Sequence, residues 1–316
     1  MAIDLSIIIP IYNEQDNIPV LYDRLKKVVE SMSVSYELLF INDGSTDASL
    51  GMLIALSDAD KNVNYINLSR NFGHQIAVTA GIDNCAGNAV VIIDADLQDP
   101  PELIVNLYAK MKEGFQVVYA RRNSRSGESF MKKFTAKLFY RILAKITSIK
   151  IPVDTGDFRI MDRKIVNVLK QMPEQQKYLR GQIAWAGFNQ TYIMYDRDER
   201  HAGSTGYTYK KMIHFALDGI TGFSNLPLKF ATFAGFFVSA ITFLLSIYAL
   251  YARFISKDYV PGWTSLILAI LFIGGVQLIS IGIIGEYISR VSSNVRNRPL
   301  YIVSDKKCQD PSTDKN

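Results

Sequence analysis

Two long stretches without a charged residue lie in the C-terminal part of the sequence and restrict the folds open to the chain. One runs between Lys229 and Arg253, and the other runs between Asp258 and Glu286. Each exceeds the roughly 20 residues that an α-helix needs to cross a hydrocarbon core of about 30 Å. Because the connection between them is short, the sequence predicts a hairpin of two membrane helices. These helices are expected at residues 230–252 and 262–285.

The distribution of basic residues predicts which side of the membrane the outer ends of this hairpin face. Lys and Arg are enriched in the cytoplasmic segments that flank membrane helices. Those outside the hairpin outnumber Arg253 and Lys257, which lie in the loop between the two helices. They are Lys210, Lys211, Lys229, Arg290, Arg296, Arg298, Lys306 and Lys307. We therefore predict a multi-pass protein of the cell (inner) membrane with both termini in the cytoplasm.

The N-terminal part has Asp4 before its first apolar run and lacks the basic stretch that begins a secretory signal. We expect it to remain cytoplasmic. The predicted division is a cytoplasmic domain at 1–205, an interfacial helix at 206–228, the two membrane helices within 229–288 and a cytoplasmic tail at 289–316. The tail is polar after about Ser304, and we expect it to be disordered there.

The composition favours a lipid surface over nucleic acid as the partner of the basic residues. The net charge is +5, and the apolar content of 48% is high for a wholly soluble protein. An anionic membrane surface attracts such a chain, and the sequence contains no motif typical of RNA or DNA binding. Cys85 and Cys308 are far apart in the sequence, so we expect reduced thiols and no zinc site.

The first 120 residues alternate apolar runs with amphipathic ones, a pattern typical of an α/β fold with a parallel, doubly wound sheet. Strands are expected at 5–11, 36–41, 63–68, 88–93 and 116–120. Such sheets bind ligands beyond the carboxyl ends of their strands. Polar clusters follow four of these strands and should converge there. They are Asn13-Glu14, Asp43, Arg70-Asn71 and Asp94-Ala95-Asp96. The sequence has no Gly-x-Gly-x-x-Gly or Walker A motif, so neither a dinucleotide fingerprint nor a P-loop explains them.

Asp94 and Asp96 follow the fourth expected strand directly. Alternate residues of a strand point to the same side, so the two carboxylates could share one divalent cation. Pro101 is well placed to begin the next helix, expected at 101–112. A solvated acidic loop, or a carboxylate that caps this helix, is the alternative. By the same capping preference, Ser45 or Thr46 is expected to cap the helix that follows the second strand.

Two further segments have an amphipathic pattern. In 128–147, basic residues recur every fourth position, and in 207–220 apolar residues precede the first charge-free stretch. We expect both to lie at the lipid interface, although 128–147 could instead pack on the sheet.

Clustered carboxylates, a metal and arginines together can hold a diphosphate and stabilise its departure. A sugar nucleotide reacts by losing its nucleoside diphosphate, and phosphoryl transfer uses similar groups. The residues alone leave these two reactions open.

Five segments together resemble the polyprenyl-phosphate glycosyltransferases of glycosyltransferase family 2, in particular the bactoprenol glucosyltransferases, and are similar to dolichol-phosphate mannose synthase. They are PIYNE (10–14), NDGSTD (42–47), LSRNFG (68–73), DADLQDPP (94–101) and TGDFR (155–159), with PLYIV (299–303) after the second charge-free stretch. The resemblance implies a GT-A fold, which is Rossmann-like with a mostly parallel sheet, carrying interfacial helices and a membrane hairpin.

The resemblance also implies roles for individual residues. Donor binding falls to Pro10, Tyr12, Glu14, Asp43, Arg70, Asp94, Arg122 and Arg200; Mg²⁺ or Mn²⁺ binding to Asp94, Asp96 and Gln98; acceptor-phosphate binding to Arg122 and Lys133; and catalysis to Asp157 and Asp96. Asp157 resembles a catalytic base, but a lipid phosphate is already ionised near neutral pH, so Asp157 could instead orient the sugar or Arg159. His74 stands where a lysine is common, and Gly206 also replaces a lysine. Both positions depart from the family pattern, and we assign His74 no role.

The implied reaction moves a hexose, with glucose from UDP-glucose favoured, to undecaprenyl or another polyprenyl phosphate with inversion. The lipid-linked product would serve glycan modification such as that of O-antigen, with a flippase and a downstream glycosyltransferase as partners. GDP-mannose, UDP-N-acetylglucosamine and UDP-aminoarabinose remain open as donors, as do homo-oligomers packed through glycines of the second span. A non-catalytic nucleotide-sugar-binding scaffold is the alternative from another class. A processive synthase is disfavoured because 176–181 lacks the Gln-x-x-Arg-Trp spacing.

Overall fold

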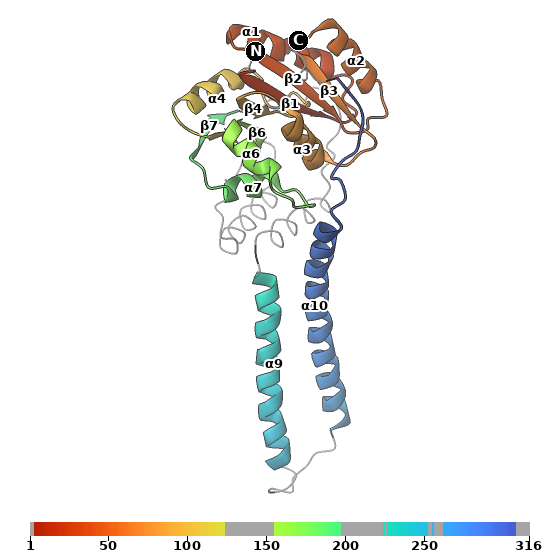
Figure 1. Ribbon diagram of the computed structural model, residues 1–316. Coiled ribbons are helices and arrows are strands. Elements are labelled where there is room, and N and C mark those ends of the chain that lie inside the picture. The colour runs from red at the N-terminus through yellow and green to blue at the C-terminus, as the bar shows by residue number, and fades with distance from the viewer. Residues whose placement is uncertain are drawn as a thin grey trace.

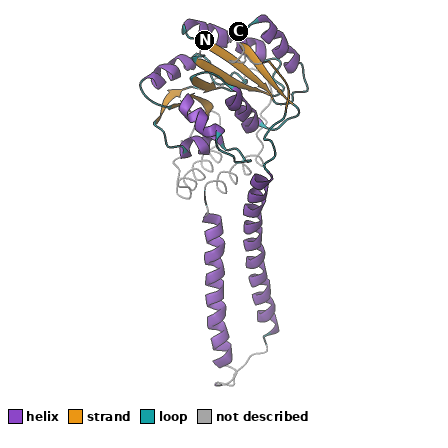
Figure 2. Cartoon of the chain, viewed as in Figure 1, coloured by secondary structure: helices purple, strands orange, loops and turns teal. Residues whose placement is uncertain are grey.

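The computed structural model describes residues 3–123, 155–196, 224, 226–251, 255 and 262–307 (Figures 1 and 2). Lys133, Arg200, Cys308 and the two predicted interfacial segments, 128–147 and 207–220, lie outside these residues. Cys85 is a buried free thiol.

In the described part of the chain, eight strands form one mixed sheet in the order β7–β5–β6–β4–β1–β2–β3–β8. The strands are β1 Leu5–Ile11, β2 Tyr36–Asn42, β3 Val63–Leu68, β4 Ala89–Ile92, β5 Val117–Arg122, β6 Thr155–Asp162, β7 Gln190–Tyr195 and β8 Val303–Lys307. Strands β4, β1, β2 and β3 are parallel neighbours, as the alternating pattern predicts. The α/β, mostly parallel sheet expected from the sequence is therefore confirmed.

Strand β6 is a feature that the alternating pattern did not predict. It runs antiparallel between β4 and β5, with Ile92 opposite Arg159 and Arg121 opposite Thr155. Because its direction is reversed, its first residues lie beside the carboxyl ends of its two neighbours. This reversal is what brings Asp157 to the edge where the ligand of a parallel sheet binds.

Helices cover both faces of the sheet (Figure 1). They are α1 Ile18–Ser31, α2 Ser49–Ala59, α3 His74–Asn84, α4 Leu103–Lys112, α6 Arg163–Lys170 and α7 Leu179–Trp185. Along β1, Ile7 and Ile9 enter the core under α1, α2 and α4, whereas Ile8 enters the core under α3, α6 and α7. Strand residues alternate between two faces, so a strand buried on both sides is apolar throughout.

Two predictions about helix starts are wrong. Neither Ser45 nor Thr46 caps α2, because α2 begins at Ser49 and Asp47 Oδ1 accepts its N–H at 3.0 Å. Ser45 Oγ instead accepts the N–H of Asn13 at 3.0 Å, which ties the loop after β1 to the loop after β2.

The second wrong prediction about a helix start concerns Pro101. This residue precedes α4 and is not its first residue. The helix begins two residues later, at Leu103, and its N-cap Glu102 makes no side-chain cap hydrogen bond. The Glu102 carboxylate instead pairs with Arg24, at 2.6 Å.

The polar segment after Ser304 is ordered through Lys307, so the prediction of a disordered tail is wrong for these residues. Strand β8 pairs antiparallel with β3, and Tyr65 donates a hydrogen bond to Asp305 at 2.5 Å. Lys307 Nζ lies 2.7 Å from Asp58. An edge strand leaves N–H and C=O groups unpaired, and β8 satisfies those of β3.

The two charge-free stretches form α9 (Leu226–Tyr251) and α10 (Trp263–Arg296), which lie side by side and project away from the sheet (Figure 1). Both are long and apolar enough to cross a membrane, judged by length and composition. Large apolar side chains on them are exposed, including Phe236 at 71% and Leu278 at 72%. Helix α10 continues beyond the predicted end at 285, and Asn294 accepts the N–H of Gln175 at 3.0 Å.

Gly44, in the loop after β2, packs closely against the loop after β3. It has a φ of +65°, and a Cβ there would lie 2.4 Å from the carbonyl carbon of Arg70. We expect Gly44→Ala to destabilise the chain by about 3 kcal/mol, because the Arg70 loop must move.

Thermal unfolding of the full chain in detergent measures this effect. Gly51→Ala is the matched control, since a Cβ at Gly51 meets nothing within 4 Å and α2 should tolerate it. An unfolding temperature of Gly44→Ala equal to that of wild type would contradict the expected clash.

Candidate active site

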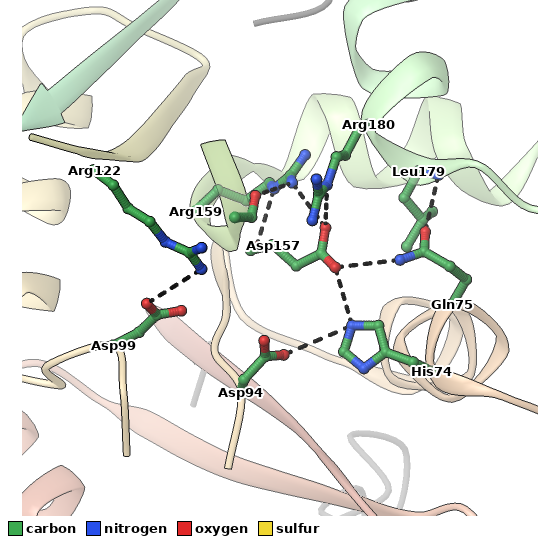
Figure 3. Close-up of polar contacts among 10 residues, drawn as sticks. His74, Gln75, Asp94, Asp99, Arg122, Asp157, Arg159, Leu179 and Arg180 are labelled. Carbon is green, nitrogen blue, oxygen red and sulfur yellow. Dashed lines mark hydrogen bonds and ion pairs between the residues drawn. The ribbon is translucent and has the colours of Figure 1, made fainter. Parts of the chain in front are cut away.

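The carboxyl edge of the sheet gathers charged side chains that are distant in the sequence (Figure 3). Asp94 follows β4, Asp157 lies near the start of β6, and Arg122 ends β5. His74 is the first residue of α3. Of these residues, Asp94 belongs to a polar cluster predicted to lie at this edge, where the parallel strands end, whereas Asp157 reaches the edge at the start of the antiparallel strand β6.

Asp157 is held by donors from three elements. Arg180 Nε lies 2.8 Å from Oδ1, and Arg159 Nη2 lies 3.1 Å from the same oxygen. On the other oxygen, His74 Nε2 lies 3.1 Å away, and Gln75 Nε2 donates at 3.3 Å. Both carboxylate oxygens are therefore occupied by donors. Donors from Arg180, Arg159, His74 and Gln75 thus use the acceptor positions of this carboxylate.

The electrostatics agree with this geometry. Burial opposes ionisation of Asp157, but Arg180, His74 and Arg159 hold its pKa well below the usual range. For His74, burial disfavours the charged form, but the carboxylates of Asp94 and Asp157 outweigh it and raise the pKa to about 9. At neutral pH the group is an ionised carboxylate surrounded by cations.

Asp94 is in the opposite situation. Its Oδ1 is buried and accepts no hydrogen bond among the described residues, with His74 Nε2 at 3.6 Å. Burial raises its pKa to about 6, with His74 acting against the rise and the Asp157, Asp99 and Asp96 carboxylates adding to it. A buried carboxylate oxygen without a donor is a suitable ligand for a cation.

Asp96 and Gln98 lie on either side of a sharp turn at Leu97. Leu97 has a φ of +58°, a conformation that is costly for a leucine, and Asp96 Oδ1 accepts the N–H of Gln98 at 3.2 Å. No three Asp, Glu, His or Cys side chains of the described residues form a group that could hold a metal. Mg²⁺ is commonly bound by one or two carboxylates plus substrate phosphates and water, so Asp94, Asp96 and Gln98 fit that type of site.

The residues predicted to bind the donor follow β1, β2 and β3. Asp43 accepts the N–H groups of Phe72 and Gly73, at 2.7 and 2.9 Å, so it also holds the loop after β3. Burial raises the pKa of Asp43. The Arg70 guanidinium packs over the ring of Phe72 at 4.0 Å. Asp43 therefore fixes the loop after β3 in addition to its predicted place in the donor site.

The other predicted donor residues lie at the end of β1. Pro10 is a buried residue of this strand, and Tyr12 just beyond it is 48% exposed. Glu14 accepts a hydrogen bond from the side chain of Asn17 at 2.5 Å, and its N–H donates to Ser49 Oγ at 3.1 Å. Tyr12 is thus open to contact with a ligand, whereas Glu14 also fixes the start of α1.

Arg122 is positioned by two residues that sequence reasoning missed. Its Nε donates to the Tyr195 hydroxyl at 3.3 Å, and its Nη2 lies 3.9 Å from Asp99 Oδ1. The Tyr195 hydroxyl in turn donates to Asp99, which is fully buried. A Cβ at Gly156 would lie 3.1 Å from Arg122 Nη2, so the glycine leaves space for the guanidinium.

The other missed residues are His74, Gln75 and Arg180, which contact Asp157. His74 departs from the family pattern, and Arg180 lies in 176–181, where the sequence has no motif that assigns it a role. Because His74 and Arg180 lie 83 and 23 positions from Asp157, no local pattern pairs them with it.

The sheet, its layers and the charged site at its carboxyl edge define a GT-A fold of the α/β class. The chain belongs to glycosyl transferase family 2, whose family model matches residues 6–169. A second model, the GtrB C-terminal hairpin, matches residues 226–291, which include α9. The family predicted from the sequence motifs is confirmed, and the chain is a glycosyltransferase.

Similar proteins cover nearly the whole chain. An uncharacterized glycosyltransferase of Synechocystis is 50% identical over 305 residues, covering 96% of each chain. The bactoprenol glucosyl transferase of Shigella phage SfII is 40% identical, covering 95% of this chain and 97% of its own. A prophage bactoprenol glucosyl transferase homolog of Escherichia coli is 39% identical, covering 95% and 98%.

Proposed function

We propose that this protein transfers one hexose from a nucleotide sugar to a polyprenyl phosphate at the cytoplasmic face of the membrane, with inversion and with a divalent cation. UDP-glucose is the favoured donor, and undecaprenyl phosphate the favoured acceptor. The similarity to bactoprenol glucosyl transferases over 95% of the chain supports the acceptor class. The observation that carries the reaction type is the buried Asp94 oxygen without a hydrogen-bond donor, at the edge where Arg122 and Asp157 also lie.

The residues of the site would have two functions, namely binding of the donor and stabilisation of the leaving group. Tyr12, Glu14, Asp43 and Arg70 lie after β1, β2 and β3, where they would hold the base, ribose and phosphates. A divalent cation, held by Asp94, Asp96 and Gln98, would neutralise charge on the departing diphosphate. The guanidinium of Arg122, fixed by Tyr195 and Asp99, would add hydrogen bonds to a phosphate.

The nucleophile of this reaction needs no strong base. A phosphate monoester is ionised near neutral pH, so its oxygen can attack the anomeric carbon directly. Asp157, whose oxygens both accept hydrogen bonds, would act by fixing the surrounding cations. Attack from the face opposite the diphosphate would give a β-linked product from an α-linked donor.

The long helical hairpin suits a lipid acceptor. A polyprenyl chain stays in the bilayer, so its phosphate is presented at the membrane surface. Helices α9 and α10, if they span the membrane, would keep the catalytic domain at that surface. In this proposal, residues 1–205 form the cytoplasmic catalytic domain, and residues 289–316 form a cytoplasmic tail after the second membrane helix.

The reaction can be tested with membranes that contain the full chain, labelled UDP-glucose and undecaprenyl phosphate. We expect a labelled product that partitions into organic solvent and releases glucose on mild acid treatment. GDP-mannose, UDP-N-acetylglucosamine and UDP-aminoarabinose form the donor panel. Tight nucleotide-sugar binding without product from any donor would refute the proposal and favour a non-catalytic scaffold.

Removal of divalent cations gives a separate prediction. We expect excess EDTA to reduce transfer at least about 100-fold, because several kcal/mol of charge stabilisation on the diphosphate would be lost. Readdition of Mg²⁺ or Mn²⁺ should restore the rate, which the organic-phase assay measures. Full activity in EDTA after dialysis against a chelating resin would contradict the metal requirement.

A further inference from the structure

The cations around Asp157 differ in their access to solvent. The Arg159 side chain is 1% exposed and donates to the backbone carbonyls of Gly156 and Asp157. The side chains of Arg180 and His74 are 20% and 37% exposed. Arg159 therefore serves the fold of β6, whereas Arg180 and His74 can be reached by a ligand.

Asp157 holds these two accessible side chains next to each other. Arg180 contacts Oδ1 and His74 contacts Oδ2, so the carboxylate of Asp157 fixes the distance between these two side chains. Gln75 strengthens the arrangement, since it donates to Asp157 and accepts the N–H of Leu179 at the start of α7. Helix α3 and helix α7 are thereby joined through this carboxylate. The contacts to Asp157 use Arg180 Nε and His74 Nε2, so a phosphate would accept hydrogen bonds from the other nitrogens of these two side chains.

Their position relative to the leaving-group residues is the second observation. His74 Nε2 lies 3.6 Å from Asp94, and Figure 3 shows Arg122 on the other side of Asp94. A nucleophile must approach to about 3–3.5 Å from the anomeric carbon, on the face away from the diphosphate. A group bound at Arg180 and His74 would therefore be separated by Asp94 from a diphosphate bound at Arg122.

We infer that His74 and Arg180 bind the phosphate of the lipid acceptor, and that Asp157 spaces and anchors this pair. The inference rests on the proposed function. It gives roles to His74 and Arg180, to which the sequence assigns none. In this inference Asp157 supports a phosphate site and does not remove a proton. Within the described residues, this pair replaces Arg122 as the acceptor contact and leaves Arg122 to the donor.

The test compares Arg180→Gln and His74→Gln with wild type in the full chain purified in detergent. We expect each variant to raise the KM for undecaprenyl phosphate at least about 10-fold, the effect of one charged hydrogen bond, and to change the KM for UDP-glucose less than twofold. Arg24→Gln is the matched control, because Arg24 pairs with Glu102 at 2.6 Å on the surface. It should change neither value.

Direct binding supplies a readout that needs no turnover. Geranyl phosphate, titrated calorimetrically into the full chain without donor, should bind wild type and Arg24→Gln equally and bind Arg180→Gln at least about 10-fold more weakly. UDP with Mg²⁺ should bind all of them alike. Arg180→Lys, which retains the charge, should restore part of the geranyl phosphate affinity, and this covers the case in which Arg180→Gln unfolds.

The outcomes separate this inference from the proposed function. If both glutamine variants transfer sugar at the wild-type rate with an unchanged KM for undecaprenyl phosphate, the phosphate site is overturned and the proposed function stands. Equal losses in donor and acceptor binding would also overturn the phosphate site, because they indicate a merely structural role. Absence of transfer by wild type with every donor would overturn both.

Discussion

Replacement of Asp94 by asparagine should abolish sugar transfer while making the unliganded protein more stable. We expect the rate to fall at least about 1,000-fold, since a cation ligand at the leaving group is lost. The stability should rise because Asp94 Oδ1 is buried without a hydrogen bond among the described residues, and burial raises its pKa to about 6. A neutral amide removes the cost of keeping that charge at neutral pH.

The sign of the pH dependence follows from the same shift. The pKa of Asp94 is higher in the folded chain than its ordinary value near 4, so the folded state favours the protonated form. Its ionisation destabilises the fold above about pH 6, and this cost is relieved as the pH falls through the window from about 6 to 4. The difference in unfolding temperature between Asp94→Asn and wild type should therefore shrink over that window.

Thermal unfolding in EDTA and the organic-phase transfer assay measure the two effects of this substitution. Asp58→Asn is the control, because Asp58 is exposed and pairs only with surface Lys307 in the contacts found for it. It should retain full activity. An Asp94→Asn protein that transfers sugar at the wild-type rate would exclude Asp94 from the leaving-group site.

Replacement of Asp157 by asparagine should have the opposite effect on stability, although it should also abolish transfer. The carboxylate faces Arg180 at 2.8 Å, Arg159 at 3.1 Å and His74 at 3.1 Å. Removing its charge leaves the buried Arg159 without its ionic partner, and breaking a buried pair in this way costs about 3–5 kcal/mol. We expect a large drop in unfolding temperature and a loss of activity of at least about 1,000-fold.

Asp162→Asn is a matched control on the same strand. Asp162 caps α6 by accepting the N–H of Lys164 at 2.7 Å, and asparagine caps a helix almost as well. It should leave stability and activity nearly unchanged. If Asp157→Asn retained the wild-type unfolding temperature, the carboxylate would not be the anchor of the surrounding cations, and a role as catalytic base would regain support.

Much of the fold could be predicted because short-range rules govern it. The apolar runs of β1, β2, β3 and β4 stand out since each strand is buried on both faces and must be apolar throughout. Strand β8 was missed because four of its five residues are exposed, so no apolar pattern marks it. Its pairing depends on the free edge of β3, which is far away in the sequence.

The site divides in the same way. Asp94, Asp96 and Asp157 could be chosen from motifs, since each lies in a segment that the family pattern contains. The partners of Asp157 could not be chosen, because His74, Gln75 and Arg180 come from other elements. The Asp99–Tyr195–Arg122 contacts likewise join residues up to 96 positions apart.

The sequence by itself determined the family, the α/β class, the helical hairpin and the identity of the principal carboxylates, because periodicity, composition and motif spacing are local properties. Only the tertiary structure decided what those carboxylates can do. The antiparallel direction of β6 sets Asp157 among three cations, whereas the half-buried Asp94 has one cation, His74, and three other carboxylates near it. Two aspartates that look alike in the sequence thus differ in charge preference, since the pKa of a carboxyl group is set by the neighbours that folding provides.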